Sequence, residues 1–287
     1  MTPLRQKMID AMQLRGFSPR THECYLRAVR DLAKHYSQSP EYLDKKQLQS
    51  YFLYLTKERG LSPSSCRQSL NAIRFLYLHV LHREGFEVDL VTPKRPQRIP
   101  ELLTVGEVAR IIAECKKLRD RTLLQTCYGC GLRVSELVAL KVRHIDGEPK
   151  LLRIEQAKGA KDRYIRLSDR LLAHLRVYWQ ACRPREWLFV SHYREYATPL
   201  TITTVQKIFK DAKAKAGIEK VGGIHSLRHA YATHQLNQGM PIQMLQKMLG
   251  HSDIRSTLRY LHWVPQYNSV NTEADLLANL EAQSDER

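Results

Sequence analysis

The chain has 287 residues, a length that suits one large domain or two of ordinary size. Hydrophobic residues make up 43% and charged residues 26%, which is an ordinary globular balance. The 46 basic residues outnumber the 29 acidic ones and give a formal net charge of +17. Such a surplus favours a polyanionic partner rather than a small-molecule substrate, because neutralising phosphates releases condensed counterions. A solvated basic surface is the alternative.

Membrane and secretion signals are missing from the sequence. No apolar run reaches the ~20 residues of a membrane-spanning helix, and the N-terminus leads into an amphipathic segment rather than a signal peptide. We therefore expect a cytoplasmic protein with reduced thiols. Cys127 and Cys130 form a lone Cys-x-x-Cys, so they are interpreted as buried packing residues rather than zinc ligands.

The first ninety residues show helical apolar spacing throughout. Ser-Pro pairs mark two helix starts, because the serine side chain can cap the helix and proline fits its first position. The pattern predicts four helices: one around Met8–Met12, one from Ser18-Pro19 to Tyr36, one over 46–59, and one that begins at Ser62-Pro63 and continues to Val80.

A proline-rich basic segment follows. Residues 91–100 contain three prolines and three basic residues, which argues for an extended linker. The predicted organisation is a helical domain over 1–88, a linker over 89–103, a second domain over 104–270 and a C-terminal helix over 271–287.

The second domain is predicted to be mainly α-helical with a small β-hairpin. Thr104 and Glu107 form a capping-box pattern at its first helix. Further helices are expected over 121–130 and 135–140, and strands over 151–155 and 163–167 flank a basic tip. Residues 187–190 could add a short strand. The fold class is therefore mainly α, with an N-terminal four-helix domain and an α+β domain after it.

Two clusters near the C-terminus carry the chemistry. The first is His225-Ser226-Leu227-Arg228-His229, and the second runs from Gly250-His251 to Tyr260. Arginine donates two hydrogen bonds to a phosphate and stays charged, while a tyrosine hydroxyl can be a nucleophile. Imidazoles can move protons. Together these side chains suit chemistry on a phosphodiester.

Metal-dependent routes fit the sequence less well. It has no obvious acidic cluster of the kind that holds two magnesium ions. His225, His229 and His234 lie near one helix face, but no His-Glu-x-x-His pattern occurs. We therefore expect no metal and no other cofactor.

Five segments resemble the tyrosine recombinases, the phage-integrase family. Residues 126–137 are similar to its first arginine motif, 156–163 to its lysine-bearing hairpin, 225–228 to its His-x-x-Arg motif, and 250–260 to its closing motif. The N-terminal helices resemble its core-binding domain. The Xer-type and integron-integrase branches look most similar, and the resemblance spans nearly the whole chain.

The resemblance implies a role for each matched residue. Arg133 and Arg228 would clamp the scissile phosphate, and Tyr260 would attack it and become linked to the 3′-phosphate. Lys158 would protonate the 5′ leaving hydroxyl. The remaining roles are these: His225 as acid or base on the tyrosine proton, His251 as a hydrogen-bond donor to a phosphate oxygen, and Glu136 as support for the arginine site.

Several neighbouring residues have simpler interpretations. Lys161 is an alternative to Lys158, and Tyr128 and Tyr267 are alternative phenols without the spacing of Tyr260 from His251. The remaining expectations are these: His229 and His234 as packing or surface histidines, Tyr231 as a core residue, Arg255 and Arg259 as solvated or DNA-facing, the methionine and leucine stripe of 240–249 as helix core, and Trp263 packed under the helix of Tyr260.

The resemblance also implies assembly on double-stranded DNA, and the protein would be associated with the bacterial nucleoid while it is bound there. The enzyme would act as a tetramer on two sites, through a Holliday junction, for integration, excision or resolution of a mobile element or replicon. The acidic tail over 271–287 would dock Leu276, Leu277 and Leu280 on a neighbouring protomer. The alternatives are a DNA-binding protein with an inactive recombinase-like domain, and a type IB topoisomerase.

Overall fold

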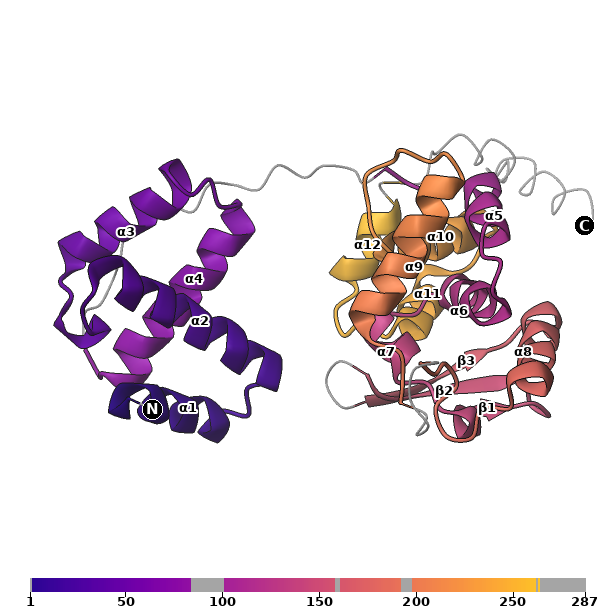
Figure 1. Ribbon diagram of the computed structural model, residues 1–287, viewed down its shortest axis with the longest axis horizontal. Coiled ribbons are helices and arrows are strands. Elements are labelled where there is room, and N and C mark those ends of the chain that lie inside the picture. The colour runs from indigo at the N-terminus through magenta and orange to yellow at the C-terminus, as the bar shows by residue number, and fades with distance from the viewer. Residues whose placement is uncertain (1, 84–100, 158–160, 192–197, 262, 264–287) are drawn as a thin grey trace, which may run out of the picture. The chain divides into compact units, whose positions relative to one another are not determined.

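The computed structural model describes residues 2–83, 101–157, 161–191, 198–261 and 263 (Figure 1). The chain divides into two compact units, Met1–Arg98 and Ile99–Arg287, and each is described by itself. Most of the predicted linker and the predicted C-terminal helix lie outside the described residues, so their boundaries stay predictions. No helix in the described part of the chain is long and apolar enough to cross a membrane.

The N-terminal unit is helical, as predicted. Its elements are α1 (Pro3–Leu14), α2 (Pro19–Tyr36), the 3₁₀ turn η1 (Pro40–Tyr42), α3 (Lys45–Lys57), α4 (Pro63–Phe75) and the π-helical turn η2 (Leu76–Val80).

Side-chain caps explain where these helices begin. The Ser18 and Ser62 hydroxyls accept hydrogen bonds from backbone amides three residues later, at 3.3 and 3.2 Å, and proline follows each serine. Asp44 and Gln47 form a reciprocal capping box at α3. Each cap satisfies amides that the first helical turn leaves unpaired.

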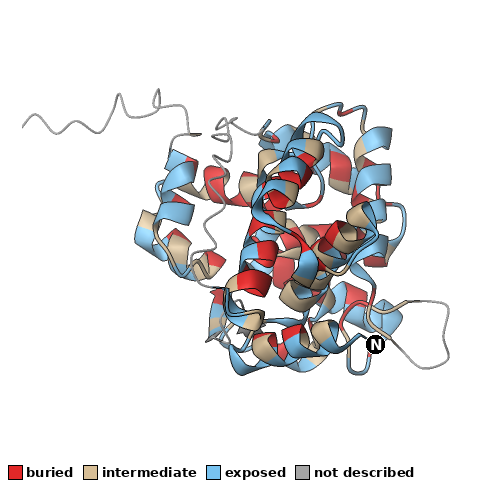
Figure 2. Ribbon diagram, turned by 90° about the vertical axis from the view of Figure 1, so that its left-hand side faces the viewer, coloured by how far each residue is buried: buried red, intermediate tan, exposed pale blue. Residues whose placement is uncertain are grey.

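Apolar positions of α1 to α4 meet in one core. Met12, Leu32, Leu48 and Ile73 are completely buried, and each comes from a different helix. Buried and exposed residues alternate along the helices at the spacing expected for amphipathic helices (Figure 2). This unit therefore has a hydrophobic core of its own.

The second unit combines helices with a small sheet. Its helices are α5 (Val105–Ala113), α6 (Leu118–Gly129), α7 (Val134–Val138), the 3₁₀ turn η3 (Val142–His144), α8 (Asp169–Cys182), α9 (Ile202–Lys215), α10 (His225–Asn237), α11 (Ile242–Leu249) and α12 (Arg255–Leu261). The predicted capping box at α5 is present, with Thr104 and Glu107 exchanging bonds of 2.7 and 3.2 Å.

The sheet has three antiparallel strands in the order β1-β2-β3. They are β1 (Ile145–Asp146), β2 (Leu151–Ala157) and β3 (Lys161–Arg166). The register pairs Leu152 with Ile165 and Ile154 with Arg163. The predicted hairpin is confirmed and its strands are longer than expected, whereas β1 is short and was not predicted.

The predicted short strand over 187–190 is not a strand of this sheet. Trp187 and Val190 form only isolated bridges, to Lys141 and Pro199. Leu188 and Phe189 are buried between them, and the Leu188 amide donates to the Leu140 carbonyl at 2.8 Å. The apolar run therefore fills the core in an extended segment.

Helix α10 lies at the centre of the second unit. It packs against α5, α6, α11 and α12, while α11 also contacts β3 (Figure 1). A large core lies on one side of this arrangement, and a smaller buried cluster holds Tyr231, Leu245, Leu249 and Tyr260. The smaller cluster joins α10, α11 and α12, the three helices that carry the two C-terminal motifs.

Candidate active site

Four helices bring most of the predicted site residues together. Arg133 precedes α7, and Arg228 lies in the first turn of α10. His251 follows the C-terminal end of α11, and Tyr260 lies in α12. The predicted leaving-group acid, Lys158, lies outside the described residues, so its role stays a prediction.

Arg228 is the most buried of these side chains. Its relative exposure is 1%, and it donates to the carbonyls of Gly131 and Leu249 at 2.7 Å each. Burial and the neighbouring charge of Arg133 lower its pKa to about 10, so the guanidinium still carries its charge at neutral pH. Two backbone carbonyls, one from the turn before α7 and one from the end of α11, thus fix the direction of this guanidinium.

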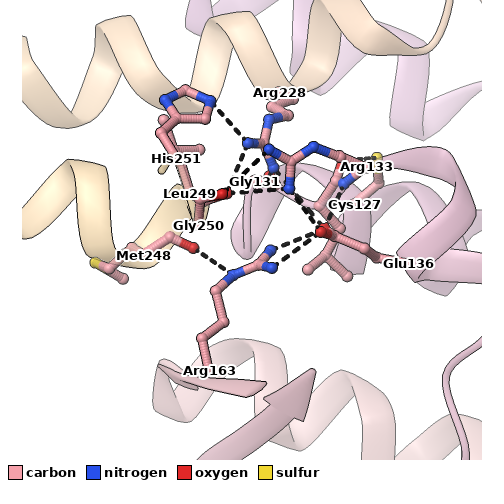
Figure 3. A network of polar contacts seen from close by, with 11 residues as sticks. Cys127, Gly131, Arg133, Glu136, Arg163, Arg228, Met248, Leu249, Gly250 and His251 are labelled. Atoms are coloured by element: carbon pink, nitrogen blue, oxygen red, sulfur yellow. Dashed lines mark hydrogen bonds and ion pairs between the residues drawn. The ribbon is translucent and has the colours of Figure 1, made fainter. Parts of the chain in front are cut away.

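Arg133 is held by Glu136 and by the end of α11. Its Nη1 lies 2.8 Å from Glu136 Oε1, and its backbone amide donates to Glu136 Oε2 at 2.9 Å. Further bonds of 3.3 Å reach the carbonyls of Leu249 and Gly250. Arg133 and Arg228 therefore share the Leu249 carbonyl, which places the two guanidiniums next to each other (Figure 3).

Glu136 is a buried carboxylate among arginines. Burial alone would raise the pKa of this carboxyl, but hydrogen bonds and charge from Arg163 and Arg133 lower it to about 2. The carboxylate is therefore ionised at neutral pH and orients Arg133. These contacts agree with the expected supporting role.

Arg163 is a site residue that was not predicted from the sequence. It donates to both oxygens of Glu136, at 2.9 and 2.8 Å, and its Nε donates to the Met248 carbonyl at 2.9 Å (Figure 3). The signal was present, because Arg163 lies two residues before the buried Ile165 on the same face of β3. A charged residue at an inward-facing strand position needs a partner.

His251 connects the arginines to α12. Its Nε2 lies 3.0 Å from the Arg228 guanidinium, which can only donate, so Nε2 accepts. In the neutral ring Nδ1 then carries the proton and donates to Thr257 Oγ1 at 2.9 Å. Burial and the cations Arg228, Arg133 and Arg163 lower the pKa of His251 to about 4, which keeps the ring neutral at pH 7.

Tyr260 lies beside His251, and its hydroxyl is within hydrogen-bond distance of His229. The rings of Tyr260 and His251 are parallel, with centroids 6.3 Å apart, and Trp263 meets Tyr260 edge-on at 5.1 Å. The packing predicted for Trp263 is confirmed. The Tyr260 hydroxyl lies 3.1 Å from His229 Nδ1. Burial raises the pKa of the Tyr260 phenol, and the charge of Arg228 opposes that increase.

His229 packs against the rings of His225, Tyr260 and Trp263, which agrees with the packing role expected from the sequence. The sequence did not predict that this side chain also contacts the predicted nucleophile. Burial, His225 and Arg228 lower the pKa of His229 to about 4, so the ring is neutral at pH 7 and its Nδ1 can accept a hydrogen bond from the Tyr260 hydroxyl. Its position one helical turn after His225 was the available signal, since residues four apart share a helix face.

His225 is adjacent to this pair. Its ring meets that of His229 edge-on, with centroids 4.5 Å apart. Loss of hydration and the cations Arg228 and Arg133 lower the pKa of His225. A line of aromatic rings thus runs from His225 through His229 to Tyr260.

Other predicted residues lie outside this network. Cys127 and Cys130 are buried, as expected, and burial raises the pKa of each thiol to about 12. Tyr128 bonds to His234 Nδ1 at 2.9 Å, which ties α6 to α10. The described residues contain no cluster of three or more histidine, cysteine or acidic side chains that could hold a metal ion.

The remaining expectations have mixed outcomes. Tyr231 is buried and Arg255 and Arg259 are exposed, as predicted. The stripe of 240–249 is core only in part, since Leu245 and Leu249 are buried but Met244 is 53% exposed.

Comparison with known families accounts for this arrangement. The model of the phage integrase family matches residues 101–266, and that of its N-terminal SAM-like domain matches residues 4–85. These matches identify a DNA breaking-rejoining enzyme that acts at specific sites. The chain belongs to the phage integrase family and is a tyrosine recombinase.

Curated relatives agree with this assignment, and solved structures share the fold. The chain is 38% identical to y4qK of Sinorhizobium fredii, a proposed integrase/recombinase, with 91% of this chain and 84% of that one covered. It is 34% identical to tyrosine recombinase XerA of Pyrococcus horikoshii, covering 75% and 82%. The fold is similar to XerH bound to a palindromic difH substrate, with a TM-score of 0.74 at 18% identity over 90% and 81%. It is also similar to a lambda integrase dimer bound to a core site, with a TM-score of 0.71 at 17% identity over 89% and 76%.

Proposed function

We propose that Tyr260 attacks a phosphodiester of duplex DNA and forms a 3′-phosphotyrosyl bond with release of a 5′ hydroxyl. The bond energy is kept in the ester, so a second 5′ hydroxyl can displace Tyr260 and restore the DNA backbone. Exchange of strands between two sites would pass through a Holliday junction. Integration, excision and resolution of a mobile element or replicon all use this reaction.

One observation carries the proposal: two arginines, a histidine and a tyrosine from four separate segments lie in one connected network. Arg133 and Arg228 share the Leu249 carbonyl, Arg228 contacts His251, and the His251 and Tyr260 rings are parallel. Fixed cations next to a phenol suit in-line attack on a phosphate, because they stabilise the charge that develops on the phosphate oxygens.

The role proposed for each residue follows from the hydrogen bonds or protons that its side chain can donate or accept. Arg133 and Arg228 would hold the phosphate, and His251 would hydrogen-bond one of its oxygens. For that bond Nε2 must leave Arg228 and gain a proton as the phosphate arrives, either by a change of tautomer in which Nδ1 loses its proton or by protonation of the whole ring. Lys158 would protonate the leaving 5′ oxygen. His225 would accept the tyrosine proton, and we add His229 as a candidate because it is hydrogen-bonded to the phenol.

The Arg228 and Tyr260 side chains are buried in this structure. Arg228 is 1% and Tyr260 is 3% exposed, so neither can reach a phosphate without a change in conformation. We therefore propose that DNA binding moves α12, replaces the carbonyl partners of the arginines in part by phosphate oxygens, and releases Tyr260 from His229. Charge-assisted bonds to phosphate would offset the lost bonds to carbonyls.

Double-stranded DNA and further copies of this chain are the proposed partners. XerH and lambda integrase are both solved on DNA, the latter as a dimer. The net charge of +17 supports contact with a phosphate backbone. We propose a tetramer on two sites in the cytoplasm, with the tail over 271–287 docked on a neighbouring protomer through Leu276, Leu277 and Leu280. Deleting 271–287 should then reduce cooperative DNA binding and recombination, and unchanged values would contradict this docking.

The direct test is recombination between two labelled duplexes whose sequence is taken from the genomic neighbourhood of the gene. We expect exchanged products and a Holliday junction intermediate with the wild-type chain, and neither with Tyr260→Phe. A type IB topoisomerase would instead relax a supercoiled plasmid that lacks the site. Relaxation without exchange would contradict the proposed function.

A further inference from the structure

The charges around Glu136 do not balance. Three guanidiniums, those of Arg133, Arg163 and Arg228, surround this single carboxylate at 2.8, 2.8 and 3.8 Å (Figure 3). Two of them are the predicted phosphate clamp. The third, Arg163, has no role in the proposed reaction, although its side chain is 9% exposed and makes three hydrogen bonds.

Arg163 pairs with the Glu136 carboxylate more closely than the other two arginines do. Its two terminal nitrogens meet the two oxygens of Glu136 in a forked pair, the geometry in which a guanidinium binds a carboxylate most strongly. The Arg133 side chain reaches only Oε1, and the Arg228 contact is longer than a hydrogen bond. Glu136 can therefore orient Arg133 while most of its own charge is offset by Arg163.

We propose that Arg163 is a positioning residue that offsets the charge of Glu136 and so leaves the charges of Arg133 and Arg228 for the scissile phosphate. With Arg163 present, three cations and one anion leave two positive charges in the network. Without it, Glu136 would pair fully with Arg133, and one positive charge would remain. This inference rests on the proposed function, because it assumes that the two clamp arginines bind phosphate.

Arg163 also holds the backbone that receives the clamp. Its Nε donates to the Met248 carbonyl, and the next two carbonyls, of Leu249 and Gly250, accept from Arg228 and Arg133. These carbonyls belong to the last two residues of α11 and to its C-cap Gly250, where a helix has unpaired acceptors and partial negative charge. Arg163 thus acts on both clamp arginines, through Glu136 and through this segment.

The experiment separates the charge of Arg163 from its place in the fold. Cleavage of a nicked suicide duplex is timed with saturating protein for the wild type, Arg163→Met, Arg163→Lys and the double variant Arg163→Met/Glu136→Gln. DNA affinity and thermal melting are measured for each. The double variant removes one positive and one negative charge, so it restores the net charge of the wild-type network without restoring the fork.

We expect Arg163→Met to slow cleavage by roughly 100-fold, the size of effect that follows loss of one group stabilising transition-state charge. Arg163→Lys should stay within about tenfold of the wild type, and the double variant should recover at least about tenfold of the loss. DNA affinity should change little, because Arg163 is buried. A purely structural tie predicts the reverse, with the double variant no faster than Arg163→Met.

The other possible results also support or overturn the role proposed for Arg163. Wild-type cleavage by Arg163→Met overturns the proposal, as does a double variant that recovers nothing. If Arg163→Met does not melt cooperatively, Arg163→Lys carries the test, because it keeps the charge and loses the fork; cleavage more than about tenfold below wild type then overturns the proposal. The variant Tyr260→Phe tests the proposed function separately. A covalent adduct that persists in this variant contradicts the proposed function rather than the role of Arg163.

Discussion

At the scale of single residues, the site depends on which group each side chain meets. The sequence predicted Arg133, Arg228, His251 and Tyr260, and the fold brings all four together. It did not predict that the Tyr260 hydroxyl lies 3.1 Å from His229 Nδ1. Motif spacing identifies residue types that suit the chemistry, whereas the partner of each atom depends on how α10 and α12 pack.

His229 should influence cleavage more than a histidine of similar burial elsewhere on α10. We expect His229→Leu to slow adduct formation by roughly 10- to 100-fold at unchanged DNA affinity, because the phenol loses the group that orients it and can take its proton. The matched control is His234→Leu, which breaks the bond to Tyr128 and leaves Tyr260 untouched. Equal cleavage rates for the two variants would contradict this role.

At the scale of elements, helix starts and the hairpin could be predicted because their signals are local. Ser18, Ser62 and the pair Thr104 and Glu107 each cap the helix that the sequence indicated. Local signals could not predict the extended segment at 187–190 or the short β1. Long-range packing decides whether a short apolar run pairs as a strand.

The end of α11 is the element on which the clamp depends. Gly250 has φ +63°, and a Cβ there would lie 2.9 Å from Arg163 Nη1, which Glu136 holds in place. Gly250→Ala should therefore cost about 1–3 kcal/mol of stability and slow cleavage at least about tenfold, through backbone strain and displacement of the carbonyls that receive the arginines.

Gly217→Ala is the matched control for this change. Gly217 follows α9 with φ +66°, and a Cβ added there would meet no atom within 4 Å among the described residues. Chemical denaturation should show a loss of about 1 kcal/mol and cleavage should be unchanged. If Gly250→Ala behaves like Gly217→Ala in both assays, the close packing of Arg163 against this turn is not important.

At the scale of the whole molecule, the buried titratable groups predict how stability varies with pH. His229 and His251 have pKa values of about 4 in the folded chain against an ordinary 6.5, so the unfolded chain binds more protons between these values. Stability then falls as the pH drops from 6.5 to 4. Glu136, at about 2 against 4.5, adds stability above pH 4.5 that is lost as the pH falls towards 2.

Thermal melting at pH 7.5 and pH 5 checks this dependence. The melting temperature of the catalytic unit should be lower at pH 5, and the double variant His229→Gln/His251→Gln should show a smaller difference. The variant is needed because the positive net charge also grows as the pH falls and opposes folding on its own. A difference of the same size in both chains would contradict the contribution of the two histidines.

We propose that Tyr260 is the nucleophile of a site that also contains Arg133, Lys158, His225, Arg228 and His251. The most direct measurement is to trap the covalent complex on a nicked suicide duplex, digest both components, and identify the modified peptide by mass spectrometry. We predict a nucleotide joined through its 3′-phosphate to Tyr260, with a free 5′ hydroxyl on the released strand, and no adduct with Tyr260→Phe. A nucleotide on another side chain, such as Tyr128 or Tyr267, or a 5′-phosphate linkage, would contradict the claim.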